Sequence, residues 1–146
     1  MPELPERLTN GLKDRLCGIV GEAWVIVDPD RLFAYESDGL TAYRKRPGAV
    51  VLPENTDEVS RVLAILSQEG VSVVPRGAGT GLSGGALAEP DAVVIGTARM
   101  TAMLQFDPDN RLARVQPGMI NANLTTAAEP YGLYYAPDPS SQSACT

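Results

Sequence analysis

One stretch decides the fold of this chain: Val74-Pro75-Arg76-Gly77-Ala78-Gly79-Thr80-Gly81-Leu82-Ser83-Gly84-Gly85-Ala86. It holds five of the chain's 14 glycines. These glycines follow an apolar run at 71–75 that predicts a buried strand. Glycine lets backbone amides approach a ligand closely, and successive amides can form an anion-binding concavity. A surface turn needs only one or two glycines. The stretch therefore predicts a loop that cradles a phosphate or pyrophosphate, where Arg76 faces the anion or pairs with a carboxylate.

Two familiar phosphate-binding motifs do not account for this loop. Gly79-x-Gly81-x-x-Gly84 has the spacing of the dinucleotide-binding fingerprint, which requires a strand before the loop and a helix after it. Here Pro90 and a third apolar run at 92–95 follow within a few residues and leave no room for a helix. The sequence also lacks the Gly-Lys-Ser/Thr triplet of the P-loop. We therefore expect the loop to bind its anion without a helix dipole behind it.

The residues before the loop predict a strand, a helix and a second strand. Residues 49–53 form a short apolar run, and Asn55 with Glu58 fits the first and fourth positions of a capping box. The helical stripe that follows consists of Val59, Val62, Leu63 and Leu66. Gly70 ends the helix where a left-handed residue is common, and 71–75 is the next strand. This order predicts a parallel pair of strands joined by a right-handed crossover.

The first 48 residues give a weaker pattern. Residues 1 to about 22 predict an amphipathic helix whose inward face carries Leu8, Leu12, Leu16 and Ile19. Residues 28–48 are expected to be irregular, because Asp, Pro and Gly interrupt any period. The basic cluster 43–47 is interpreted as a solvated approach to the first strand, with a role near an anionic group as the alternative.

The residues after the loop predict a second set of elements. In order, these are a third strand at 92–95, a hairpin of 103–106 and 112–115 around the turn 107–110, a helix over about 119–129, a short strand at 133–135 and a loop at 136–146. Ile120 and Leu124 are expected to face inward, and Pro130 with Gly132 ends the helix. Because the sequence stops within a Pro/Ser loop, we expect a truncated chain; a short flexible tail is the alternative.

Composition restricts the classes of function. The 146 residues hold 12 Lys and Arg against 18 Asp and Glu, a formal net charge of −6, which argues against a nucleic-acid partner. The chain has no histidine, which excludes a His-based triad or a His metal ligand, and no metal site is expected. Cys17 and Cys145 are interpreted as free thiols of a cytoplasmic protein. No signal peptide and no transmembrane segment are predicted.

The sequence resembles a known family. The glycine-rich stretch looks like the pyrophosphate-binding loop of the FAD-binding PCMH-type domain of the vanillyl-alcohol oxidase superfamily. Within that superfamily it is most similar to the branch that contains the D-type subunit of glycolate oxidase and D-lactate dehydrogenase. Further segments agree in order with that family: 47–53, 115–118 with 131–133, 137–141 and 144–146. The resemblance covers residues 36–146.

The resemblance implies an α+β fold, in which a small parallel β-α-β subdomain is followed by a mainly antiparallel one. It divides the chain into an N-terminal helical or irregular extension at 1–45 and an FAD-binding PCMH-type domain at 46–146, incomplete at its C-terminal end. It also implies chemistry: FAD takes a hydride from a small 2-hydroxy acid, glycolate- or D-lactate-like, and gives the 2-oxo acid. A stand-alone, non-catalytic nucleotide-binding or subunit-interaction module is the alternative.

The resemblance assigns cofactor binding to Pro75, Arg76, Gly77, Ala78, Gly79, Thr80, Gly81, Leu82, Ser83, Gly84, Gly85, Pro137, Asp138, Ser141 and Thr146. Relatives that bind flavin covalently place a histidine near this loop, so non-covalent FAD is expected here. A β-branched residue at Gly79 or Gly81 is expected to abolish flavin binding. Substrate and catalytic residues are expected to lie beyond position 146, and an iron–sulfur partner subunit is possible in this family.

Overall fold

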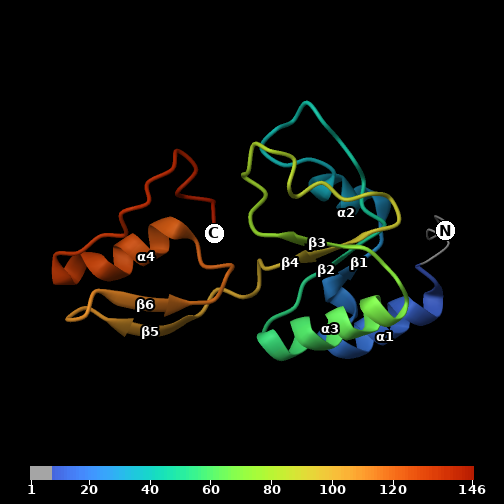
Figure 1. The fold of residues 1–146 in the computed structure, drawn as a ribbon, viewed down its shortest axis with the longest axis horizontal. Helices are drawn as coiled ribbons and strands as arrows, with labels where there is room; N and C mark the ends of the chain where they lie inside the picture. Colours follow the sequence, from blue (N-terminus) through green and yellow to red (C-terminus); the bar gives the residue numbers. More distant parts are fainter. Residues whose placement is uncertain (1–7) are drawn as a thin grey trace.

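A four-stranded sheet forms the centre of the first part of the chain (Figure 1). The structure is a computed structural model and describes residues 8–146. The strands are β1 (Val25–Ile26), β2 (Ala49–Val51), β3 (Val73–Arg76) and β4 (Val93–Gly96). Their order in the sheet is β1-β2-β4-β3; β2, β4 and β3 run parallel, and β1 runs antiparallel to β2.

The position of β4 corrects the predicted pairing. β2 and β3 are parallel, as the helix between them requires, but they are not neighbours, because β4 lies between them. Val94 of β4 is opposite Val50 on one side and Val74 on the other. Val93 and Val94 are fully buried, as expected of a strand that has a neighbour on each side. The strand-helix-strand pattern fixes relative direction, and it does not fix adjacency.

Two helices cover one face of the sheet, α1 (Asn10–Val20) and α3 (Thr56–Gln68), and Figure 1 shows them side by side. Leu12 and Leu16 of α1 pack with Val62 and Leu66 of α3 in one core cluster. Thr9 caps α1, so Leu8 precedes the helix, and residues 1–7 of the predicted helix lie outside the described residues. Leu8 is nevertheless buried, as predicted, and Ile19 packs against the same cluster.

Two details of α3 differ from the prediction. Asn55 accepts from the Glu58 amide at 3.0 Å, as a capping box requires, but the Glu58 carboxylate accepts from the Glu54 amide at 2.8 Å and not from Asn55. Leu63 of the predicted stripe is 42% exposed, and Ile65 packs against the core in addition to Val62 and Leu66. The inward face is therefore rotated slightly from the predicted one, while Gly70 follows the helix at φ +64°, as predicted.

The opposite face of the sheet is covered by α2 (Pro29–Leu32) and by residues 88–92. Two 3-10 helices lie nearby in the sequence, η1 (Glu22–Trp24) before β1 and η2 (Phe33–Tyr35) directly after α2. Asp28 caps α2 by accepting from the amides of residues 30 and 31. The segment 28–48, expected to be irregular, therefore contains short helices, and its Leu32 is part of the core beneath the sheet's second face.

The second part of the chain is a hairpin packed against a helix. The hairpin is β5 (Met103–Asp107) with β6 (Leu112–Val115), followed by α4 (Asn121–Ala128) and the 3-10 helix η3 (Glu129–Tyr131). The predicted hairpin and helix are thus confirmed. The strand predicted at 133–135 is wrong, because the Leu133 amide donates to Ala128 O and the Tyr135 amide to Thr125 Oγ1. These amides hold the segment against α4 and are not available to a strand partner.

A close junction joins the two parts. Arg99 donates to Leu52 O and to Glu54, both at 2.8 Å, and its guanidinium lies 4.1 Å from the Trp24 ring centroid. Gly118 approaches so closely that a Cβ there would overlap the Thr97 carbonyl oxygen. Figure 1 shows the C-terminal end of the chain returning to the space between the two parts.

Candidate functional site

The glycine-rich loop lines a cavity of about 320 Å³ at the end of β3. Its lining residues come from three separate segments. They are Asp38, Pro75, Arg76, Gly77, Ala78, Gly79, Thr80, Gly81, Leu82, Ser83, Gly85, Ala86 and Thr146. Ten of the eleven loop residues predicted to bind the cofactor, 75–83 and Gly85, therefore line one cavity. Gly84 does not line it, but adopts φ +74° in the same loop.

The backbone of the loop is free to bind an anion. Within the described part of the chain, the amide N–H groups of residues 78–86 donate to no other atom. Unpaired amides in such a bend carry partial positive charge and suit an anionic ligand. A Cβ at Gly81 or Gly85 would meet nothing within 4 Å, so the glycines keep this space open. The loop thus has the donors and the room that a pyrophosphate group requires.

Arg76 supports the loop from inside. Its side chain is buried, Nη1 donates to Ser37 O at 2.9 Å, and the guanidinium lies 5.5 Å from the Tyr35 ring centroid. Burial lowers the pKa of Arg76, and Tyr35 and Asp38 oppose that shift. A Cβ at Gly79, which has φ +73°, would overlap this guanidinium. The loop therefore packs at Gly79 against the Arg76 side chain, which is held by its hydrogen bond to the backbone carbonyl of Ser37.

Asp38 forms a wall of the cavity that the sequence does not predict. Asp38 is 5% exposed and accepts from the Leu40 amide at 2.9 Å through Oδ1. A Cβ at Gly39 would lie 2.7 Å from Thr80 O and 2.9 Å from Gly81 O, so this turn packs directly on the glycine-rich loop. The Asp-Gly pair is the signal that the sequence offers, and on its own it indicates only a break in periodicity.

The second predicted segment contributes one residue to the cavity. Thr146 lies beside Gly77, where a Cβ would overlap its hydroxyl. Pro137, Asp138 and Ser141 are not among the described residues that line the cavity, and Pro137 O accepts from Asn121 Nδ2 at 3.1 Å. Their assignment to cofactor binding stays a prediction. The carbonyls of Gln142 and Cys145 cap the first amides of α4, so this segment covers the helix N-terminus.

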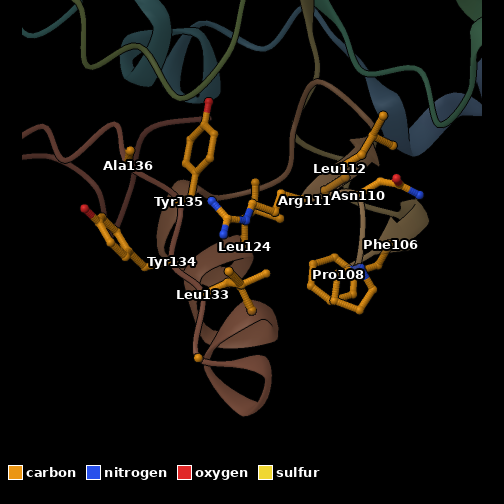
Figure 2. Close-up of a pocket in the computed structure, with 13 residues that line it drawn as sticks. Phe106, Pro108, Asn110, Arg111, Leu112, Leu124, Leu133, Tyr134, Tyr135 and Ala136 are labelled. Carbon is orange, nitrogen blue, oxygen red and sulfur yellow. The ribbon is translucent and has the colours of Figure 1, made fainter.

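A larger cavity, about 730 Å³, lies in the second part of the chain between the hairpin, α4 and residues 132–136. Figure 2 shows Phe106 and Pro108 of the hairpin on one side and Leu133 on the other, while Tyr134 points away. Phe106 also contacts Tyr131, with ring centroids 5.4 Å apart. No residue of the glycine-rich loop lines this cavity. Volume alone would favour it, but the unpaired amides make the smaller cavity the candidate anion site.

The basic cluster is paired with carboxylates. Arg44 and Arg46 contact Glu36 at 2.9 and 3.4 Å, and Lys45 pairs with Glu89. The side chains of both arginines are half exposed, in agreement with the interpretation as a solvated segment. Among the described lining residues of the cavity, none comes from this cluster.

Comparison with known proteins identifies the family of this chain. A family model described as the FAD binding domain matches residues 47–146. The glycolate oxidase subunit GlcD of Escherichia coli (strain K12) is 50% identical over 117 residues, which are 80% of this chain and 23% of that protein. The D-2-hydroxyglutarate dehydrogenase of Stutzerimonas stutzeri (strain A1501) is 35% identical over 127 residues, which are 87% of this chain and 27% of that protein. The chain spans about a quarter of the length of these relatives.

Solved structures share the fold. A crystal structure of p-cresol methylhydroxylase with substrate bound matches with a TM-score of 0.81 and 21% identity, covering 97% of this chain and 29% of that one. The expected α+β, PCMH-type fold is thus confirmed. Within residues 8–146, no helix combines the length and the apolar character that crossing a membrane requires.

Proposed function

This chain belongs to the family of the FAD binding domain, and from that premise we propose that it is the FAD-binding part of a flavin-dependent oxidoreductase. The proposed donor is a small 2-hydroxy acid, glycolate- or D-lactate-like, and the product is the 2-oxo acid. One observation carries the proposal: nine consecutive amides, those of residues 78–86, are unpaired around a cavity at the end of a parallel strand. The relatives named for glycolate and D-2-hydroxyglutarate support the class of donor, since both names denote 2-hydroxy acids.

In this proposal the residues of the chain bind and position the cofactor. The amides of 78–86 hold the pyrophosphate, Gly81 and Gly85 leave room for it, and Arg76 keeps the loop in place. Thr146 lies opposite Gly77 and approaches the cofactor from the second segment. FAD, when bound, accepts the hydride from the donor carbon.

We further propose how FAD is held, that a partner subunit exists and which compartment holds the protein. FAD is held without a covalent bond, because no histidine stands in or near the loop. A partner subunit is proposed from the name of the E. coli relative, which is called a subunit; its iron–sulfur character follows from the family resemblance alone. The cytoplasm is proposed as the compartment, in keeping with the free thiols of Cys17 and Cys145.

Calorimetric titration of the purified chain tests the cofactor site. FAD is expected to bind, inorganic pyrophosphate is expected to compete with it, and riboflavin, which has no phosphate, is expected not to bind. Absence of FAD binding, or equal binding of riboflavin, would refute the cradle. For the activity, a protein of the relatives' full length that includes this segment is expected to purify yellow and to lose its flavin absorbance under anaerobic glycolate or D-lactate. A colourless protein that takes up no added FAD would contradict the proposal.

A further inference from the structure

One buried oxygen in the wall of the cavity has no partner. Asp38 is 5% exposed, and its Oδ2 is enclosed without a hydrogen bond from any described residue. Buried polar side-chain atoms are nearly always hydrogen-bonded, so each exception calls for a physical reason. Asp38 lines the same cavity as the glycine-rich loop. The missing donor can therefore come from whatever occupies that cavity.

The groups around Asp38 do not supply this donor. The Leu40 amide donates to Oδ1, at 2.9 Å, and leaves Oδ2 aside. Arg76 of the loop donates to Ser37 O, and no described residue donates a hydrogen bond to Asp38 Oδ2. Gly39 packs against the carbonyls of Thr80 and Gly81, so the carboxylate is held beside the loop.

The two walls of the cavity offer opposite chemistry. The loop side presents donors, the unpaired amides of 78–86, and these suit the oxygens of a pyrophosphate. The Asp38 side presents an acceptor, which repels an anion and attracts a hydroxyl. A bare pyrophosphate satisfies the first wall alone. A pyrophosphate flanked by hydroxyl-bearing sugars satisfies both.

We propose that Asp38 Oδ2 accepts a hydrogen bond from a sugar hydroxyl that flanks the pyrophosphate of the bound dinucleotide. This inference rests on the proposed FAD site and deepens it, because it makes Asp38 a residue that selects a nucleotide over a simple anion. In FAD such hydroxyls lie on both sides of the pyrophosphate, on the adenosine ribose and on the ribityl chain. Both present the same hydroxyl chemistry, and the test separates them.

The test compares D38A and D38N with the wild-type chain by calorimetric titration. The probes are FAD, ADP, FMN and inorganic pyrophosphate, and the matched control is D91N, which removes one exposed carboxylate outside the cavity. A hydrogen bond to a charged acceptor predicts that D38A weakens FAD binding about tenfold. Pyrophosphate binding is expected to stay unchanged or to tighten, because a negative charge leaves the wall. D38N keeps an oxygen for the Leu40 amide and is expected to show a smaller loss in the same direction.

These opposite signs distinguish a ligand contact from a structural role. If D38A and D38N weaken pyrophosphate as much as FAD, Asp38 only supports the loop and the inference is overturned. Unchanged FAD binding in both variants overturns it as well. A loss with ADP assigns the ribose and a loss with FMN assigns the ribityl chain, whereas a loss with FAD and with neither half overturns the assignment to a sugar. If the wild-type chain binds no FAD, the proposed function itself fails, which is a different result.

Discussion

Alanine substitutions at Gly79 and Gly81 separate the two reasons for which this loop contains glycine. Gly79 has φ +73°, and an L-residue in that region costs about 1–2 kcal/mol. Its Cβ would also overlap the buried Arg76 guanidinium, which must then move away from Ser37 O. Loss of that charged hydrogen bond adds about 1.5–3 kcal/mol. We therefore expect G79A to lower the free energy of unfolding by about 2.5–5 kcal/mol, the sum of these two costs.

Gly81 provides the matched control. Its φ lies outside the left-handed region, and a Cβ there would meet nothing within 4 Å. G81A is expected to change the free energy of unfolding by less than about 0.5 kcal/mol, as surface substitutions usually do. It should still weaken FAD binding, since Gly81 lines the cavity. Backbone strain is therefore a reason for glycine at position 79 and not at position 81.

Urea unfolding followed by circular dichroism measures the stability difference, and FAD titration measures the binding. Equal stability of G79A and G81A would refute the argument from Arg76 and positive φ. An unchanged FAD affinity in a stable G81A would show that the open space at Gly81 is not occupied by the cofactor. Because stability and FAD affinity are measured separately, this pair of variants tests both the conformation of the loop and its contact with the cofactor.

Three other outcomes are expected. R99A should lower the free energy of unfolding by about 2–4 kcal/mol in urea melts, because it removes two hydrogen bonds and the contact with Trp24; R99K should recover only part of that loss. Hydrogen bonds from Asn110 lower the pKa of Asp107 below its ordinary value of 3.8, so its support of the hairpin is present above about pH 4 and is lost as the pH falls through the lowered pKa; NMR titration of the carboxyl group checks this. Acid precipitation of the flavin-loaded protein should leave all yellow colour in the supernatant, and colour on the precipitate would contradict non-covalent binding.

Much of the fold follows from patterns that local interactions enforce. The helix α3 is predictable because Asn55 caps it and because Val62 and Leu66 recur at helical spacing over a buried strand. The hairpin is predictable because Asp107 accepts from Asn110 within a four-residue turn. In each case the residues that decide the structure are close in sequence, so the signal survives without knowledge of the tertiary fold.

The features that the sequence does not predict, which are the strand β1, the place of β4 in the sheet and the conformation of 133–135, depend on distant partners. β1 has two residues and exists because Val25 and Ile26 pair with β2, more than twenty positions later. β4 separates β2 from β3 because its buried valines require a neighbour on each side, which no local pattern expresses. Residues 133–135 have the composition of a strand, but the amides of Leu133 and Tyr135 donate hydrogen bonds to residues of α4 instead of to a strand partner. Tertiary context decides all three.

The candidate site shows the same division between local and distant causes. Because glycine clustering is visible in the sequence, the loop can be predicted from it. The position of Asp38 cannot be predicted in this way, because its carboxylate lines the cavity only as a result of the packing of Gly39 against the glycine-rich loop, which is distant in sequence. Gly81 and Gly85 have open space where a Cβ would stand and no positive φ, so neither packing nor backbone conformation requires glycine at these positions. A ligand that lies against the backbone does require it, and these two residues are therefore stronger evidence for a bound cofactor than the strained Gly79.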